Sequence, residues 1–379
     1  MARQLKQDLK IMSDKSWPSW LPLNHNLIGM SPYGAPQLPV AIKLNTNENP
    51  YSLTNELVDK ILKGIREKSA ALNRYPDRDA QELRTSLAKF VNKLSKCNFS
   101  KDNIWVANGS NEIIQSIFLA FGANGALGFE PSYSVHKIIA QITNTNWQVV
   151  ARNKDFSLNL GQIMESIANQ KPSITFVTTP NNPTGTATTL EELKQIAIQM
   201  KKVNGLLVID EAYAEFSAIA SAATLIDEFE NIIVIRTMSK AFAFAGVRVG
   251  YLIANPLVIS AMMVVRLPYH LSTLTQASAQ VALENSDALL GKVSEIVSAR
   301  DALVAQLTAL GLTVAPTQAN FILFTGFTNT TSAIWQGLVD KGILIRDVGL
   351  PGYLRVSVGS EYENNKFISE LKLLLKKES

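Results

Sequence analysis

The chain has 379 residues, of which 46% are hydrophobic and 18% charged, a composition typical of a globular protein with a sizeable buried core. Its length predicts two domains. The net charge of +4 arises from 36 basic and 32 acidic residues spread along the chain rather than clustered, so a nucleic-acid partner is not indicated. A small anionic substrate is compatible with this charge.

Cysteine usage and the absence of long apolar segments bear on location. Cys97 is the single cysteine, which excludes an intramolecular disulfide and a cysteine metal cluster and suits a reducing compartment. Residues 1–15 are charged, unlike a signal peptide, and no run approaches the roughly 18 apolar residues that cross a membrane. We expect a cytoplasmic protein without membrane association and without a metal site.

The first part of the chain is rich in proline. Residues 1–44 show little periodicity, and they predict a short first helix followed by an arm that lies over another part of the protein or a partner subunit. Residues 45–50 form a polar, turn-rich run that, on its own pattern, is interpreted as a plain loop. Two amphipathic helices are expected at 54–72 and 79–96, and Tyr75 falls in the break between them.

From residue 104 onward, strands alternate with helices, which is typical of a parallel α/β sheet. A turn at Gly109, Ser110 and Asn111 opens a helix that runs to residue 121. The free N–H groups of such a turn suit a phosphate, although an ordinary helix cap has the same pattern. Strands are expected at 104–107, 127–130, 148–151, 174–177, 205–210, 232–235 and 249–254, and further helices at 133–142, 160–168, 188–203, 256–286 (interrupted at 268–270) and 287–310.

Polar side chains follow several of these strands. Tyr133 is either a core residue or a stacking partner for a planar cofactor. Asn182 stands among two prolines and a glycine, which would hold its amide rigidly. Asp210 ends an apolar strand, where it caps a helix or binds a cationic ring nitrogen or a metal; without clustered His or Cys, the nitrogen is favoured. Tyr213 lies three residues further on.

Lys240 follows the strand at 232–235 and is the candidate nucleophile. Apolar and small neighbours would desolvate it, which lowers the pKa of a lysine and favours its neutral amine. Thr237, Ser239 and Arg248 supply two hydroxyls and a guanidinium, a set suited to a phosphate. The alternative is a surface Ser-Lys pair without a chemical role.

The last part of the chain predicts a small α/β unit, with Arg346 and Arg355 in or at the ends of its strands. They are either partners in structural ion pairs or a site that captures an anion. The three histidines are too scattered for metal binding, and each is expected to be an ordinary solvated or capping residue. Strands are expected at 312–315, 320–324, 343–346 and 353–358, and helices at 331–341 and 360–376.

In combination these motifs resemble the fold-type I pyridoxal-phosphate aminotransferases. The motifs are Asn182 in Pro-Asn-Asn-Pro-Thr-Gly, Asp210 and Tyr213 in Asp-Glu-Ala-Tyr, Lys240 in Thr-Met-Ser-Lys-Ala-Phe, Arg248, and Arg355 in Leu-Arg-Val-Ser-Val-Gly. Within that superfamily the chain is most similar to the histidinol-phosphate aminotransferase family. The motifs that carry this similarity are Ser-Pro-Tyr33, Asn-Thr-Asn-Glu-Asn-Pro at 45–50, Arg-Tyr75-Pro, Pro-Tyr-His-Leu-Ser at 268–272, Ala-Asn-Phe at 319–321 and Arg346-Asp. One departure is Asn111, where many relatives have Asp.

This resemblance implies a fold and a division of the chain. The fold would be α/β, with a large domain built on a mostly parallel seven-stranded sheet between helices and a small α/β domain. Residues 1–44 would form an arm packed on the small domain and the partner subunit, 45–270 the large domain that binds pyridoxal 5'-phosphate, and 271–379 the small domain. A homodimer is implied, because Tyr75 would reach the cofactor phosphate of the other subunit.

The resemblance also implies roles for the site residues. Lys240 would bind the cofactor covalently and then transfer the proton between substrate and cofactor. Asp210 would keep the nitrogen of the cofactor ring protonated. Tyr213 and Asn182 would donate hydrogen bonds to the phenolic oxygen of the same ring. The phosphate would be held by Gly109, Ser110, Asn111, Thr237, Ser239 and Arg248, and Tyr133 remains a secondary cofactor contact.

The substrate would be bound by Tyr33, Asn182, Arg346 and Arg355. The implied reaction is transamination between L-histidinol phosphate, a phosphorylated amino alcohol, and 2-oxoglutarate, giving imidazole-acetol phosphate and glutamate in histidine biosynthesis. An aromatic amino-acid aminotransferase is the alternative with the same cofactor site, and a phosphothreonine decarboxylase is a more distant relative. A non-catalytic regulatory protein on this fold would be expected to lack Lys240 or to carry a DNA-binding segment.

Overall fold

The structure, a computed structural model, describes residues 17–376. The helix expected at the start of the chain lies outside these residues. Between residues 17 and 41 the backbone is irregular apart from one 3-10 turn, η1 (His25–Leu27). No helix within the described range is both long enough and apolar enough to cross a membrane.

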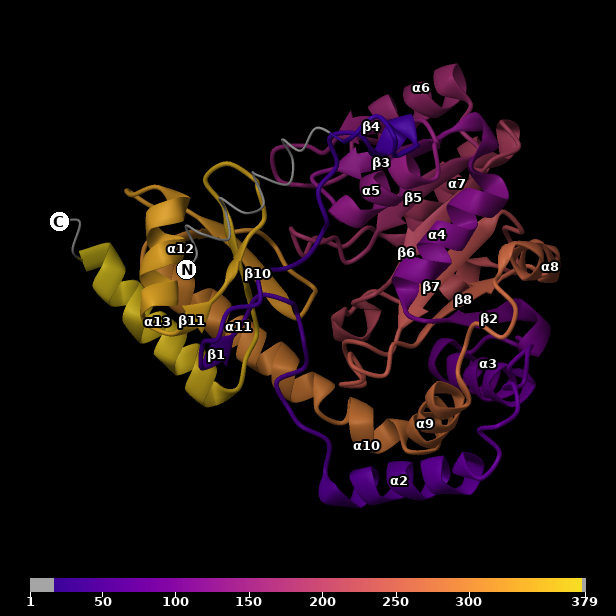
Figure 1. The fold of residues 1–379 in the computed structure, drawn as a ribbon. Coiled ribbons are helices and arrows are strands. Elements are labelled where there is room, and N and C mark those ends of the chain that lie inside the picture. Colours follow the sequence, from indigo (N-terminus) through magenta and orange to yellow (C-terminus); the bar gives the residue numbers. More distant parts are fainter. Residues whose placement is uncertain (1–16, 377–379) are drawn as a thin grey trace.

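A seven-stranded sheet forms the centre of the larger part of the molecule (Figure 1). Its order is β2-β8-β7-β6-β5-β3-β4, and β8 alone runs antiparallel to its neighbours. The expected mostly parallel sheet is confirmed. The strands are β2 (Ile104–Ala107), β3 (Ala126–Glu130), β4 (Trp147–Ala151), β5 (Ile174–Thr178), β6 (Leu206–Asp210), β7 (Ile232–Thr237) and β8 (Gly250–Ala254).

Helices cover both faces of this sheet, which explains why its central strands are mostly apolar. Along β7, Ile232 and Val234 pack with one face, and Ile233 and Ile235 pack with the other, as the two-residue period of a strand requires. One face is covered by α4 (Ser110–Phe121), α5 (Ser134–Ile142) and α8 (Pro256–Val265), and the other by α3 (Gln81–Ser95), α6 (Leu160–Gln170) and α7 (Leu190–Lys202).

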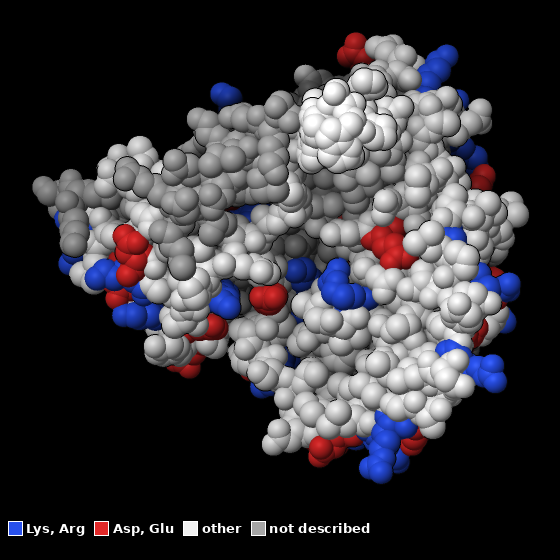
Figure 2. All heavy atoms as spheres, viewed as in Figure 1, with Lys and Arg blue, Asp and Glu red and all other residues white. Residues whose placement is uncertain are grey.

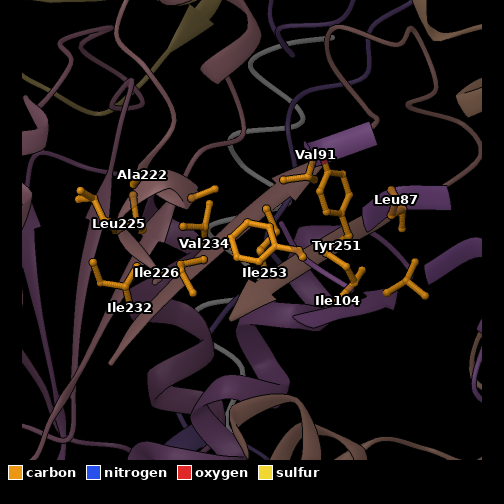
Figure 3. Close-up of a cluster of buried hydrophobic side chains, with 14 of the residues drawn as sticks. Leu87, Val91, Ile104, Ala222, Leu225, Ile226, Ile232, Val234, Tyr251 and Ile253 are labelled. Carbon is orange, nitrogen blue, oxygen red and sulfur yellow. The ribbon is translucent and has the colours of Figure 1, made fainter. Parts of the chain in front are cut away.

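The core on the second face continues beyond the sheet (Figure 3). Tyr251 of β8 and Val91 of α3 lie in one cluster with Val234 of β7 and Leu225 of the short helix η5 (Ala222–Leu225). This packing supports β7 and β8 from one face of the sheet. The carboxyl ends of the strands are therefore carried on a rigid support.

Two further helices extend this part of the molecule. α9 (Thr273–Glu284) packs against α2 (Asn55–Ser69) and α3, and α10 (Ser286–Leu290) follows it. The interruption expected at 268–270 separates α8 from α9, and Ser272 caps the new helix by accepting from Thr275 N. A second interruption at residues 291–292 separates α10 from α11 (Val293–Ala309), so the single helix expected over 287–310 is wrong.

The smaller part of the molecule is built on a four-stranded antiparallel sheet of order β12-β13-β10-β9. Helices α11, α12 (Thr331–Asp340) and α13 (Glu361–Lys376) enclose its core. A separate two-stranded parallel sheet pairs β1 with β11. The strands are β1 (Ile42–Lys43), β9 (Thr313–Val314), β10 (Phe321–Thr325), β11 (Ile343–Leu344), β12 (Arg346–Asp347) and β13 (Leu354–Ser357).

The single strand expected at 343–346 is wrong, because it is divided between two sheets. The carbonyl of Ile345 accepts a hydrogen bond from the indole Nε1 of Trp335 at 2.9 Å. β11 pairs with β1 before this residue, and β12 pairs with β13 after it. The division brings Arg346 directly opposite Arg355.

The chain crosses between the two parts more than once. β1 joins the smaller part, the next elements α2 and α3 join the larger, and α11 leads back to the smaller part (Figure 1). The division of the chain at 44/45 and 270/271 stays a prediction. Basic and acidic side chains are interspersed over the face shown in Figure 2, which also shows a hollow between the two parts.

Candidate active site

A cavity of about 390 Å³ lies where the carboxyl ends of β5, β6 and β7 meet β12 and β13 of the smaller part. Open α/β sheets bind ligands at this end of their strands. Most of the sequence-predicted site residues line it. They are Tyr33, Ser110, Asn111, Tyr133, Asn182, Asp210, Tyr213, Thr237, Ser239, Lys240, Arg248, Arg346 and Arg355.

Lys240 lies three residues after the end of β7 and reaches into this cavity. Its Nζ donates to the carbonyl oxygen of Thr46 at 2.8 Å. Burial, together with the positive charges of Arg355 and Arg248, lowers the pKa of Lys240 to about 8. A substantial fraction of this amine is therefore neutral near physiological pH, as a nucleophile or a base requires.

Asp210 ends β6 and has a buried partner that the sequence did not reveal. Its Oδ2 lies 3.2 Å from Nε2 of His136, and both side chains are 2% exposed. Its Oδ1 accepts from the backbone N–H of Ala212 at 3.2 Å. The expectation that His136 is solvated or caps a helix is wrong, because α5 packs the ring against Phe176 of the interior strand β5.

Tyr213 lies between two amides in the buried part of the site. Nδ2 of Asn47 donates to its phenolic oxygen at 3.0 Å, and Nδ2 of Asn182 approaches the same oxygen at 3.5 Å. Oδ1 of Asn182 accepts from the guanidinium of Arg355. Burial raises the pKa of Tyr213, so this phenol keeps its proton.

The turn before α4 approaches the guanidinium of Arg248 closely. Gly109 has φ +82°, and a Cβ at this position would lie 2.4 Å from Nη2 of Arg248. A side chain here would be strained by the positive φ and would force the guanidinium to move. Arg248 also donates to the hydroxyl of Ser239 at 3.3 Å. Because the first N–H groups of a helix lack partners within it, the start of α4 beside Arg248 suits an anion.

Asn111 and Tyr133 line the neighbouring wall. The hydroxyl of Tyr133 donates to Oδ1 of Asn111 at 3.2 Å, and burial raises the pKa of Tyr133. Tyr133 also packs edge-on against His136. The aromatic ring therefore borders the cavity and packs against the core at once, and its stacking on a planar cofactor stays a prediction.

Arg346 and Arg355 face each other across β12 and β13, where like charges repel. Arg355 is 6% exposed, its Nη2 donates to the carbonyl of Asn45 at 2.8 Å, and its Nε has no partner among the described residues. Burial, with the nearby charge of Arg346, lowers the pKa of Arg355 to about 10. Within residues 17–376 neither arginine has a carboxylate partner. The ion-pair alternative is wrong for this part of the chain, and the pair suits an anion.

Residues 45–47 are part of the site, so the interpretation as a plain loop is wrong. Asn45 and Thr46 give their carbonyl oxygens to Arg355 and Lys240, and Asn47 donates to Tyr213. These contacts join residues far apart in the sequence. The only local signal was the high asparagine content of the run, which suits irregular backbone and also loops without function.

Tyr75 does not line the cavity of its own chain. It is 79% exposed, and its ring stacks on that of Tyr269 with 4.4 Å between centroids. Gly109 adjoins the cavity through Ser110 without lining it. The structure therefore assembles all predicted site residues around one cavity except Tyr75.

Comparisons with known proteins agree with this geometry. Residues 39–371 match the family model "Aminotransferase class I and II". The chain is 48% identical to a histidinol-phosphate aminotransferase of Mycolicibacterium smegmatis, with 94% of each chain covered. It is 50% identical to that of Rhodococcus opacus, over 92% of this chain and 91% of the relative.

Solved structures show the same fold. A putative histidinol-phosphate aminotransferase of Erwinia carotovora atroseptica has a TM-score of 0.79 at 26% identity, covering 89% of this chain and 96% of the other. The histidinol-phosphate aminotransferase of Sinorhizobium meliloti, in complex with pyridoxal-5'-phosphate, has a TM-score of 0.78 at 24% identity, covering 90% and 92%. The protein belongs to the class I and II aminotransferases.

Proposed function

We propose that this enzyme transfers the amino group of L-histidinol phosphate to 2-oxoglutarate, giving imidazole-acetol phosphate and glutamate, as a step of histidine biosynthesis. The observation that carries the choice of substrate is the facing pair Arg346 and Arg355 at the cavity, which has the charge and the donors to hold a phosphate. Identity of 48–50% to histidinol-phosphate aminotransferases over more than nine-tenths of the chain supports it.

The residues of the cavity fit pyridoxal 5'-phosphate, the cofactor of this family. A phosphate fits the start of α4 beside Arg248, where a Cβ on Gly109 would collide with the guanidinium. Lys240 supplies the amine for covalent attachment, and the carboxylate of Asp210 fits a protonated ring nitrogen. When bound, pyridoxal phosphate supplies an electron sink that stabilises negative charge on the substrate carbon.

The side chains divide the chemical work among them. Lys240, with its lowered pKa, acts first as a base that takes the proton from the substrate carbon. It then acts as an acid that gives the proton back in a later step. Asp210, held by His136, keeps the proton on the ring nitrogen. Tyr213 would donate its phenolic proton to the phenolic oxygen of the cofactor, with Asn182 beside it. Thr237 and Ser239 complete the phosphate contacts.

Arg355 serves both half-reactions of the ping-pong cycle. Histidinol phosphate brings a phosphate but no carboxylate, whereas glutamate and 2-oxoglutarate bring carboxylates, and all three place an anion on the same guanidinium. Arg346 and Tyr33 complete the phosphate contacts at the outer part of the cavity. Asn182 connects the two ends of the site, because its Oδ1 accepts from Arg355.

The working form is a cytoplasmic homodimer. Tyr75 supports this, because it is exposed on its own chain and is held against Tyr269 away from its own cavity. In the dimer, Tyr75 reaches the cofactor phosphate of the partner subunit. Sedimentation of the purified protein tests this assembly, and a monomer with full activity would refute it.

Two measurements test the function. The purified protein supplied with pyridoxal phosphate should show the visible absorption of the bound cofactor, and its absence would refute the cofactor assignment. With 2-oxoglutarate as acceptor, histidinol phosphate should give a much higher kcat/KM than phenylalanine or tyrosine. A preference for an aromatic amino acid would instead make this an aromatic aminotransferase, and release of carbon dioxide from phosphothreonine would make it a decarboxylase.

A further inference from the structure

Asn47 is the most completely bonded residue of the segment that crosses the site. It is 1% exposed, has φ +56°, and contacts side chains from three distant parts of the chain. Ser357 of β13, Asn320 before β10, and Tyr213 after β6 all hydrogen-bond to it. Asparagine tolerates this left-handed conformation better than most residues, so it can stand here without large strain.

Ser357 sets the orientation of the Asn47 side chain. The backbone N–H of Asn47 donates to Oγ of Ser357 at 2.9 Å, and this hydroxyl donates in turn to Oδ1 of Asn47 at 3.0 Å. If the amide were turned around, the proton of the buried Ser357 hydroxyl would lose its acceptor. The carbonyl oxygen of the amide therefore faces Ser357, and its Nδ2 faces Tyr213.

Asn182 is oriented by a different group with the same result. Its Oδ1 accepts from Arg355, and a guanidinium can only donate. Its Nδ2 therefore also faces the oxygen of Tyr213, at 3.5 Å. The phenolic oxygen consequently meets two donors and no acceptor from these two amides, and its own proton is directed away from both, into the cavity.

We propose that Asn47, oriented by Ser357, is a positioning residue that makes Tyr213 a hydrogen-bond donor toward the cofactor. It acts through Tyr213 rather than on the reacting atoms. This inference rests on the proposed function, because the proton of Tyr213 matters only if a cofactor oxygen accepts it. A phenol that donates to that oxygen stabilises its negative charge, which lowers the pH at which the bound cofactor loses its proton.

Asn47→Asp is the test, because it keeps the size and backbone preference of the residue but replaces the donor with an acceptor. Tyr213 would then donate to the new carboxylate instead of to the cofactor. The visible absorption of the pyridoxal-phosphate-loaded enzyme is followed against pH. We expect its titration midpoint to rise by about one to two pH units, as the loss of one charge-assisted hydrogen bond implies.

The added negative charge could raise the midpoint without Tyr213, so the same change is made in Tyr213→Phe. Action through Tyr213 predicts that Asn47→Asp shifts the midpoint in the wild type and hardly at all in Tyr213→Phe. An equal shift in both backgrounds overturns the inference. The other titratable or charged groups close to Tyr213 are Arg355, Asp210, Lys240 and Tyr33, and all of them are retained in these variants.

Asn49→Asp is the matched charge control. Its side chain donates to the carbonyl of Ala241, makes no hydrogen bond to Tyr213 within the described part of the chain and does not line the cavity. The same charge two residues away should leave the midpoint close to that of the wild type. A shift as large as that of Asn47→Asp would assign the effect to charge alone and overturn the inference.

Ser357→Ala tests the orientation of the amide and covers the case in which Asn47→Asp does not fold. Without the hydroxyl, Asn47 can turn its carbonyl oxygen toward Tyr213, so we expect a smaller rise in the midpoint. An unchanged midpoint in folded Ser357→Ala overturns the inference, even if cofactor affinity falls. If the wild type itself shows no visible band, the proposed function fails instead, so the two failures are distinguishable.

Discussion

The two ends of the cavity balance charge in different ways. At the large sheet, the charged groups have partners within the chain: Asp210 meets His136, and Lys240 donates to the carbonyl of Thr46. At the small sheet, Arg346 and Arg355 oppose each other without a carboxylate among the described residues. The first end already contains the carboxylate of Asp210 and leaves a place for an anion beside Arg248, whereas the second end has two facing guanidiniums with no carboxylate partner among the described residues, so a bound anion would balance it.

This difference separates two kinds of effect. Groups at the large sheet act on the cofactor and on proton transfer, so changes there should affect every substrate. Groups at the small sheet act on the substrate anion, so changes there should leave the cofactor in place and alter which substrates are used. Three predictions test this separation, beginning with the largest expected effect, and a fourth tests the lowered pKa of Lys240.

Lys240→Ala should abolish the visible absorption of the bound cofactor and reduce kcat for every donor by at least about 10⁴, because the covalent anchor and the acid-base group are lost together. Absorption spectra and single-turnover kinetics measure this. Lys240→Arg keeps the charge without a usable neutral amine and should fail equally. A residual visible band in either variant would show that another group holds the cofactor.

Arg355→Ala should lower kcat/KM for histidinol phosphate and for 2-oxoglutarate by roughly 10²–10⁴, because both anions lose their charge-assisted hydrogen bonds. The visible band should persist. Arg355→Lys retains the charge but not the planar fork, so it should recover only part of the loss. If one substrate is impaired and the other is not, Arg355 does not serve both half-reactions.

Arg346→Ala should raise KM for histidinol phosphate by about tenfold, the value of one hydrogen bond to a charged group, with a much smaller effect on glutamate. The reason is that its role is to complete the phosphate contacts rather than to hold a carboxylate. Arg346→Lys is the matched control, and it should retain most of the affinity. Equal losses for both donors would contradict the division between the two arginines.

The lowered pKa of Lys240 predicts a modest effect on stability. The folded cofactor-free chain loses the proton of Lys240 near pH 8, whereas the unfolded chain keeps it up to its ordinary value of 10.5. Between these values the unfolded state binds more protons, so the free energy of unfolding rises with pH. Relative to Lys240→Met, the wild type should gain stability across this window in denaturant titrations. A constant difference would show that burial does not shift the pKa.

Much of the fold could be predicted from the sequence, because short-range patterns encode it. The apolar run at Ile232–Ile235 marked a buried strand, and Thr189 with Glu192 forms the capping box that begins α7. The expected single strand over 343–346 was wrong, because the two halves of this segment pair with different distant strands, which local propensity does not register. The same holds for His136, whose burial comes from packing against Phe176 of β5.

The sequence by itself was enough to predict which residues would carry the chemistry, because Asp210 ends a strand and Asn182, Tyr213 and Lys240 each follow one, all within recognisable motifs. Only the tertiary structure decided how they are oriented. Asn47 lies 166 residues from Tyr213 and 310 from Ser357, and no periodicity links such positions. A hydrogen bond depends on which atoms meet and which of them can donate, and that is decided only when distant segments pack together.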